Sequence, residues 1–481
     1  MAQNSRRRFL QAASATAAAW AVSHRIPALA ATGSSASVSV WTTYRDRRHA
    51  QGEPLAWKPA TEIAADAIAL DPTVTRQQIL GFGAALTDAA CYVLSQMSDA
   101  PREEIMHELF APGEMALNVC RTCIGSSDYS RSIYSFDESA EPDPELKKFS
   151  IDHDKAYILP VLREARKQNP ELFLFSSPWS PPGWMKANGS MLGGAMRSHN
   201  FDPYSRYFLK FLDAYKAEGV AIDAVTVQNE TDAEQDGKMP ACLWAQEHEI
   251  EFVEKFLGPA LRKAGSSTKI WVLDHNYNLW GRAIDELSNP GAAEYIDGIA
   301  WHGYVGEPSA MTRVHEAFPQ KNAYWTEGGP DITAPDYQTD FTKWATTYNG
   351  IVNNWARSIT AWNVALDEKG KPNIGPFPCG GVVTVDNATK KVIRSGQYWA
   401  FAHYSRHVRR GAQVFAINGI GENSTEAAAD PISHTGFRNP DGSLIVVVAN
   451  SGPEKRVQLL LGSLALDLDL PADSVHTLRW S

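Results

Sequence analysis

The chain has few cysteines and no recognisable metal-binding motif. Five cysteines among 481 residues exclude the disulfide framework of a small secreted scaffold. Cys120 and Cys123 have the spacing of a redox or zinc pair, but the sequence offers no matching second pair, so we interpret them as buried thiols on a strand. The segment "EHEIE" lacks the second histidine of a helical zinc motif.

Long apolar segments and glycine-rich phosphate loops are also missing. Beyond residue 30 no segment has the length and apolarity to span a bilayer, so we expect no integral membrane segment in the mature chain. No strand-to-helix turn carries a glycine-rich dinucleotide loop. Apolar residues make up 44% of the chain and charged residues 21%, which is typical of a folded globular protein.

The first residues resemble an export signal. "SRRRFLQ" supplies a twin-arginine stretch, an alanine-rich apolar run follows, and Ala28-Leu29-Ala30 has the small-residue pattern of a cleavage site. We predict a twin-arginine-type signal peptide at residues 1–30 and a periplasmic or secreted protein; an amphipathic first helix is the alternative. Cleavage would remove four arginines and no acidic residue, so the formal net charge of −10 would become more negative by four. Such a surface argues against nucleic acid as a partner.

The middle of the chain alternates short apolar runs with stretches of helical period. Helices between strands imply parallel pairing, and eight such units predict an α/β protein with a closed (β/α)8 TIM barrel. A doubly wound open sheet is the alternative, which the lack of a dinucleotide loop disfavours. The eight runs are "ILGFGAAL", "NVCRTCIG", "LFLFSSPW", "DAVTVQNE", "KIWVLDHN", "GIAWHGYV", "NAYWTEGG" and "SITAWNVAL".

A second domain is predicted from both ends of the chain. Short alternating strands around an Asn-Pro-Asp-Gly turn fill the C-terminal part and indicate an antiparallel β-sandwich. We predict N-terminal strands joining this sandwich at residues 31–76, the catalytic barrel at 77–400 and the C-terminal sandwich at 401–481.

Two glutamates lie where barrel strands are expected to end. Glu230 ends the fourth run and Glu327 the seventh, and the carboxyl ends of barrel strands face one mouth, where active sites form. Each alone is typical of a surface carboxylate, but the pair meets the need of glycosidic cleavage for an acid and a nucleophile or base. Side chains suited to binding a sugar are expected at or just after the ends of the other strands: Asp88, Trp179, His275, Asn276, His302, Tyr304, Trp362 and Asn363.

Four segments resemble glycoside hydrolase family 30, the glucosylceramidase-like retaining enzymes. They are "GFGAALTDAA", "SPWSPPGWMKANGSM", "VQNE" and "WTEGG", and their order and spacing agree with the family from about residue 78 to the C-terminus. The resemblance implies that Glu230 is the acid/base, Glu327 the nucleophile and Asn229 a ligand of the sugar 2-hydroxyl. It also implies that Asp88, Trp179 and Trp362 hold the sugar, and that His302 and Tyr304 lie near the nucleophile. The family likewise has a barrel and a β-sandwich built from both chain ends.

The implied activity is hydrolysis of β-glucosidic bonds in a carbohydrate or glycolipid, without metal or organic cofactor. Endo-β-1,6-glucanase, β-xylosidase and β-fucosidase activities of the same family are alternatives, as is a non-catalytic carbohydrate-binding protein. The loop "NIGPFPCGGVVTVD" departs from the glucosylceramidase pattern, in which Gly-Pro is followed by an Asn-Trp pair. A retaining pair of carboxylates should lie about 5–5.5 Å apart. We expect the charge of Glu327 to raise the pKa of Glu230 and keep it protonated.

Overall fold

The computed structural model describes residues 37–420 and 431–481. The predicted signal peptide lies outside the described residues. The described residues form one compact unit.

Eight parallel strands form the barrel, as the sequence predicts. Each strand overlaps one of the eight apolar runs, and neighbouring strands pair in parallel in the order β6-β13-β12-β11-β10-β9-β8-β7. An isolated parallel bridge between Ala85 and Arg121 joins the two ends of this sheet, so the barrel is nearly closed. The strands are β6 (Gly81–Ala84), β7 (Val119–Cys123), β8 (Phe173–Ser177), β9 (Ala224–Thr226), β10 (Lys269–Asn276), β11 (Ile296–His302), β12 (Asn322–Glu327) and β13 (Ala356–Ala361).

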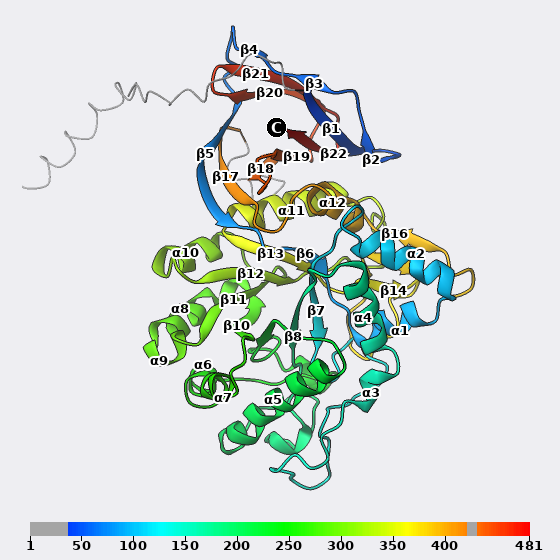
Figure 1. Ribbon diagram of the computed structural model, residues 1–481, viewed down its shortest axis with the longest axis vertical. Helices are drawn as coiled ribbons and strands as arrows, with labels where there is room; N and C mark the ends of the chain where they lie inside the picture. The colour runs from blue at the N-terminus through cyan, green and yellow to red at the C-terminus, as the bar shows by residue number, and fades with distance from the viewer. Residues whose placement is uncertain (1–36, 421–430) are drawn as a thin grey trace, which may run out of the picture. The chain divides into compact units, whose positions relative to one another are not determined.

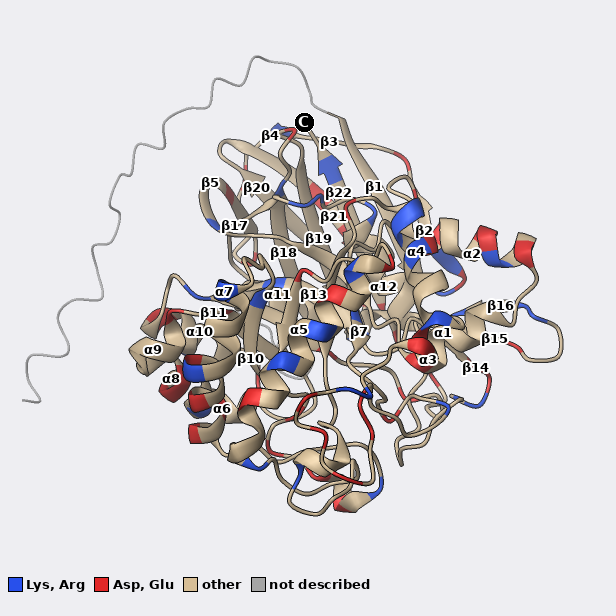
Figure 2. Cartoon of the chain, turned by 60° about the horizontal axis from the view of Figure 1, so that its bottom comes forward, with Lys and Arg blue, Asp and Glu red and all other residues tan. Residues whose placement is uncertain are grey.

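Helices connect these strands and carry much of the surface charge. Figure 2 shows acidic and basic residues on α2 and acidic residues on α6, whereas the barrel strands are largely uncharged. The helices are α1 (Asp88–Ser95), α2 (Asp99–Phe110), α3 (Asp152–Lys155), α4 (Ile158–Gln168), α5 (Phe201–Ala217), α6 (Gln246–Phe252), α7 (Gly258–Lys263), α8 (Trp280–Ser288), α9 (Pro290–Ala293), α10 (Ser309–Ala317), α11 (Phe341–Asn353) and α12 (Gly396–Ser405). A π-helical turn, η4 (Val253–Leu257), joins α6 to α7. No helix in the described ranges is both long and apolar enough to cross a membrane.

Strands from both chain ends form the sandwich in one 11-stranded sheet. Pairing is antiparallel except between β5 and β20. The N-terminal strands are β1 (Ser37–Tyr44), β2 (Arg47–Gln51), β3 (Leu55–Ala56), β4 (Lys58–Pro59) and β5 (Ile68–Gln78). The C-terminal strands are β17 (Gln413–Asn418), β18 (Ile432–Arg438), β19 (Leu444–Asn450), β20 (Lys455–Leu461), β21 (Leu464–Leu470) and β22 (Ser474–Trp480).

Helices α11 and α12 lie between barrel and sandwich (Figure 1), where they contact β18, β19 and β22. Helix α12 spans the predicted domain boundary at residue 400. A small three-stranded sheet of β14 (Ala365–Asp367), β15 (Val383–Val385) and β16 (Val392–Arg394) closes the long loop after β13.

Candidate active site

The barrel is filled by two layers of side chains that differ in polarity. The lower layer is an apolar cluster from six neighbouring strands: Val119, Phe175, Ala224, Trp271, Ala300 and Tyr324. Side chains two residues further along a strand point to the same side. In five of these strands that position is polar, namely Arg121, Ser177, Thr226, His302 and Thr326. A polar layer therefore covers the apolar one toward the carboxyl ends of the strands.

Asp274 is the centre of the polar layer. Its Oδ2 accepts hydrogen bonds from Arg121 at 2.7 Å and Thr226 at 2.6 Å, and its Oδ1 lies 3.0 Å from His302 Nε2. Burial acts to raise the pKa of Asp274, but Arg121 and His302 hold this pKa well below its usual range. Asp274 is therefore a permanently charged anchor.

Sequence periodicity missed Asp274 because β10 is irregular. The period of two from Trp271 would place Leu273 inside, yet the pairing register shifts between Leu273 and His275. Leu273 and Asp274 have positive φ values of 71° and 44°. A bulge of this kind re-aims the following side chain, so the aspartate takes the inner position. The sequence did contain a signal: Asp274 is a charged residue inside an otherwise apolar run. Arg121 gives the same signal in its own run.

Above the polar layer lies a cavity of about 360 Å³. Six of the predicted site residues line it: Trp179, Asn229, Glu230, Tyr304, Glu327 and Trp362. His275 and Asn276 line it as well. This volume falls within the range of small-molecule sites.

Glu327 is the last residue of β12, and both of its carboxylate oxygens are held. Arg121 donates to Oε2 at 2.5 Å, and the Tyr304 hydroxyl donates to Oε1 at 3.0 Å. Its side chain is only 8% exposed. Burial raises the pKa of Glu327 above its ordinary value, against the opposing charges of His302 and Arg121. The carboxylate is thus fixed in orientation toward the cavity.

Glu230 follows β9 by four residues rather than ending it, contrary to the predicted strand. Its φ of 52° is left-handed, which ends strand geometry, and its backbone N–H donates to the Asp274 carbonyl at 2.9 Å. The Gln235 amide donates to Oε2 at 3.1 Å. This strained turn is supported from β10, so the side chain projects into the cavity from a fixed backbone.

His302 lies between the two glutamates. Its Nδ1 is 3.4 Å from Glu230 Oε1, and its Nε2 is 3.7 Å from Glu327 Oε2. Burial alone would lower the pKa of His302, but Glu327, Asp274 and Glu230 raise this pKa to about 9. The imidazole therefore carries a proton at neutral pH.

The expected pKa of Glu230 was wrong in direction. Burial acts to raise this pKa, yet His302 lowers it more through a hydrogen bond and its positive charge, with His275 and Gln235 adding to the effect. The prediction counted the charge of Glu327 and left out the imidazolium between the carboxylates. The proton expected on Glu230 is held by His302 instead.

Two tryptophans form one wall of the cavity. The rings of Trp179 and Trp362 stack with centroids 5.0 Å apart, and the Arg121 guanidinium lies 4.6 Å from the Trp179 centroid. Asn229 lies beside them, and its Oδ1 accepts from Arg121 at 2.7 Å. Because this acceptor is occupied, the Asn229 amide presents its N–H groups to the cavity.

Asp88 is not among the residues that line this cavity. It begins helix α1, where its carboxylate accepts from the Tyr157 hydroxyl at 2.9 Å and the Arg131 backbone N–H at 3.0 Å. Asp128, which the sequence reasoning missed, lines the cavity instead. Its Oδ1 is buried without a hydrogen-bond partner among the described residues, and burial raises its pKa well above the usual value. Its sequence context, "SSDYS" in the loop after β7, offered no apolar run to mark it.

Asn363 is also outside the cavity lining. It is fully buried, and its Oδ1 accepts from the Thr87 hydroxyl at 2.8 Å. This bond ties the end of β13 to the turn before α1. The bond therefore anchors the backbone next to Trp362.

The unusual loop after β13 brings Phe377 to the cavity rim. Phe377 is 40% exposed, and the Tyr129 hydroxyl donates to its carbonyl at 2.8 Å and accepts from the Cys379 N–H at 2.7 Å. The Ile374 N–H donates to the Asp128 carbonyl at 2.8 Å. The segment that carries Asp128 thus fixes the rim loop.

Two carboxylates on one sugar-sized cavity, at the carboxyl ends of barrel strands, define a glycoside hydrolase. The comparisons agree. The glycosyl hydrolase family 30 TIM-barrel model matches residues 79–408, and the family 30 β-sandwich model matches residues 411–478. The chain belongs to glycosyl hydrolase family 30.

Relatives within the family differ in the substrates that their names give. An endo-1,6-β-D-glucanase of Neurospora crassa is 33% identical over 393 residues, which cover 79% of this chain and 80% of the relative. A lysosomal acid glucosylceramidase of Mus musculus is 28% identical over 438 residues, covering 86% and 83%. A solved endo-β1,6-glucanase superposes with a TM-score of 0.82 at 30% identity, over 92% of this chain and 99% of that one.

Proposed function

We propose that the protein hydrolyses β-glucosidic bonds with retention of configuration, with Glu327 as nucleophile and Glu230 as acid/base. The observation that carries this proposal is the shared imidazole: Glu230 and Glu327 line one cavity and lie against opposite nitrogens of His302. Glu327 is oriented by Arg121 and Tyr304, as attack on an anomeric carbon requires. Glu230 follows a different strand, β9, and so reaches the glycosidic oxygen from a different part of the cavity wall than Glu327.

His302 supplies the proton that Glu230 needs. Sugar entering the cavity displaces water, and desolvation disfavours the Glu230–His302 ion pair relative to the neutral pair. The proton then passes from His302 Nδ1 to Glu230, which donates it to the glycosidic oxygen as Glu327 attacks. Once Glu327 is esterified, the largest charge that raises the pKa of His302 is gone. Neutral His302 leaves ionised Glu230 free to take a proton from water.

The sugar next to the bond is held by Asp128, Asn229 and the tryptophan wall. The unpaired Asp128 oxygen accepts a sugar hydroxyl, and the Asn229 amide donates to the 2-hydroxyl oxygen. The aromatic faces of Trp179 and Trp362 cover the apolar side of the ring.

Within β-glucosides, we favour β-1,6-glucan as the substrate. The relatives named endo-1,6-β-D-glucanase include one at 33% identity and a solved one at 30%. The exposed ring of Phe377 beside the cavity gives a second glucose a surface for stacking. Glucosylceramide is the second candidate, because Tyr304, Val305 and Phe377 are exposed near the mouth and suit an apolar aglycone.

Product analysis tests both levels of this proposal. Proton NMR of the earliest product from an aryl β-glucoside should show the β-anomer; the α-anomer would contradict retention. Rates on β-1,6-glucan, glucosylceramide, and aryl β-xylosides and β-fucosides then rank the substrates. Phe377→Ala should lower kcat/KM on β-1,6-glucan about tenfold by loss of stacking, and should leave the aryl glucoside rate nearly unchanged. Equal effects on the two substrates would argue against a second sugar on this ring.

We also propose export through the arginine-rich N-terminus, which the residue pattern of positions 1–30 supports. Replacing Arg6, Arg7 and Arg8 by lysine should leave precursor inside the cell, whereas the unaltered chain should appear, shortened, in the periplasm or medium. Export of the triple variant at the normal level would contradict the twin-arginine route.

A further inference from the structure

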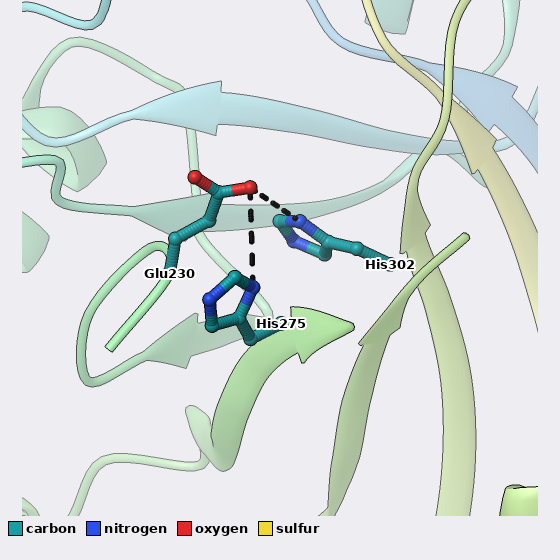
Figure 3. Close-up of side chains that lie close together, drawn as sticks. All are labelled: Glu230, His275 and His302. Carbon is teal, nitrogen blue, oxygen red and sulfur yellow. Dashed lines mark ion pairs between the residues drawn. The ribbon is translucent and has the colours of Figure 1, made fainter. Parts of the chain in front are cut away.

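Three side chains from neighbouring strand ends meet at one carboxylate oxygen. Glu230 Oε1 is 3.4 Å from His302 Nδ1 and 3.9 Å from His275 Nδ1. Figure 3 shows both imidazole rings with a nitrogen facing this oxygen. The three potential ligand atoms all lie within 4.8 Å of one another. The arrangement is two histidines and one glutamate about a common centre.

Neither histidine Nδ1 is held at ordinary hydrogen-bond distance. His302 is fully buried and His275 is 8% exposed; within the described part of the chain His275 Nδ1 has no hydrogen bond, and His302 Nδ1 has a long, 3.4 Å contact with Glu230 Oε1. Buried polar atoms without partners are uncommon and call for an explanation. A cation bound to both Nδ1 atoms would satisfy them and would take the place of the proton on His302.

We propose that Glu230, His275 and His302 bind a divalent transition-metal cation such as Zn²⁺, which reversibly inhibits the enzyme. Zinc binds nitrogen and carboxylate ligands at about 2.0–2.2 Å, so two ligands of a tetrahedral ion lie about 3.4 Å apart. The Glu230–His302 distance already has this value, and the Glu230–His275 distance exceeds it by about half an ångström. Two histidines and a glutamate with one open position are a known zinc ligand set.

The surroundings of His302 suit this role. Its Nε2 is hydrogen-bonded to Asp274 Oδ1 at 3.0 Å, which orients Nδ1 toward the proposed ion. A carboxylate on the far nitrogen of a ligating histidine fixes the ring and makes it a stronger ligand. Asp274 is itself held by Thr326 and Thr226. The bulge that turned Asp274 inward thus builds the support for a metal ligand.

Inhibition is expected because one of the three ligands is Glu230, and it rests on the proposed role of Glu230 as the acid/base. A cation on Oε1 occupies the lone pair that would carry the catalytic proton, and it also displaces the proton of His302. Imidazole ligands favour Zn²⁺, Cu²⁺ and Ni²⁺, whereas Mg²⁺ prefers oxygen ligands. Mg²⁺ is therefore a matched negative control for charge.

Direct binding and activity are measured separately on untagged, chelator-treated protein. Calorimetry should show one Zn²⁺ per chain, and bound Co²⁺ should give visible absorption. Zn²⁺ should suppress hydrolysis of an aryl β-glucoside, EDTA should restore it, and Mg²⁺ should do neither. His275→Asn should weaken Zn²⁺ binding at least about tenfold, whereas His199→Asn, at an exposed histidine outside the cavity, should not. Circular dichroism checks that both variants are folded.

Each result separates the two proposals. Absence of Zn²⁺ binding, or equal binding by wild type and His275→Asn, would overturn the metal site and leave the roles of the glutamates standing. Zn²⁺ bound at His275 without loss of activity would overturn the inhibition and would count against Glu230 as the acid/base.

Discussion

Histidines gather in two regions of the molecule, and the pKa of His302 in one region moves in the opposite direction to the pKa values of the histidines in the other. In the active site the pKa of His302 is raised to about 9. At the seam between barrel and sandwich, burial lowers the pKa of His476 to about 4 and that of His49 to about 3, and lowers those of His403 and His407 well below the ordinary value. Both regions are buried, so burial alone does not explain the difference.

The partners of the rings explain it. His302 faces three carboxylates, those of Asp274, Glu230 and Glu327. The seam histidines face hydroxyls and one another: His403 contacts Thr43 and Thr477 at 2.8 Å each, and His49 Nε2 lies 2.8 Å from His407 Nε2. Nearby arginines, including Arg406 and Arg47, add positive charge. Neutral partners keep the seam rings uncharged, whereas the carboxylates around His302 keep its ring protonated.

His275 sharpens the contrast within the active site itself. It lies 3.9 Å from one carboxylate, and burial lowers its pKa to about 4. Proximity to an acid is therefore insufficient. The proton stays on the ring that is hydrogen-bonded to Asp274.

The largest expected effect comes from removing the charge of Glu327. Glu327→Gln should reduce kcat on an aryl β-glucoside by about 10⁴-fold or more, because it removes the proposed nucleophile. It should also lower the pKa of His302, since the charge of Glu327 is the largest influence that raises it. Activity assays and NMR titration of the histidine ring measure the two effects in one variant.

Tyr304→Phe is a control for this experiment, because it removes the hydrogen bond to Glu327 Oε1 and keeps the charge. Its His302 pKa should stay near that of the wild type. Near-normal turnover by Glu327→Gln would exclude Glu327 as the nucleophile, and an unchanged His302 pKa would contradict its charging by Glu327.

Low pH should destabilise the seam between barrel and sandwich. A histidine whose pKa is lowered in the folded state binds a proton more readily in the unfolded state. Its contribution to the free energy of unfolding is therefore complete above pH 6.5 and is lost as pH falls. For His476, going from pH 7 to pH 4 should lower the free energy of unfolding by about 3 kcal/mol. His302 has the opposite sign: its contribution is complete below pH 6.5 and is lost as pH rises through about 9.

Denaturant unfolding between pH 7 and pH 4 measures this, with His476→Gln in the same buffers. The difference in pH slope between the two proteins isolates His476 from the carboxylates. Equal slopes would contradict a neutral, buried His476 as the source of acid sensitivity.

Sequence periodicity predicted the barrel because its eight strands are apolar, short and separated by helices. It also placed Glu230, Glu327, Trp179 and Trp362 on one cavity, since residues at the carboxyl ends of parallel strands converge. Asp88 was assigned on the same rule and fell on the helix side of its turn, as the first residue of α1. A single sequence does not fix where a strand gives way to a helix within two or three residues.

The rest of the site depends on three-dimensional detail. Asp274 turns inward only because of a bulge, and Asp128 comes from an irregular loop. The pKa values of the glutamates depend on His302, whose ring orientation is set by Asp274. Contacts between residues tens of positions apart decide which of these side chains carry a proton, and local sequence patterns do not predict such contacts.

The smallest expected effect tests the neutral partners of the seam. Thr43 is fully buried, and its hydroxyl contacts His403 Nε2 and accepts from the His49 backbone N–H, each at 2.8 Å. Thr43→Val keeps the shape of the side chain and leaves these groups without a partner, which should cost about 2 kcal/mol in the free energy of unfolding at pH 7. Thr339→Val, at an exposed threonine, should change it by less than about 0.5 kcal/mol. Similar small losses of unfolding free energy in both variants would mean that burial and packing alone hold the seam histidines neutral. A loss confined to Thr43→Val would assign that role to the Thr43 hydroxyl. This hydroxyl would then be the neutral counterpart of the carboxylates around His302.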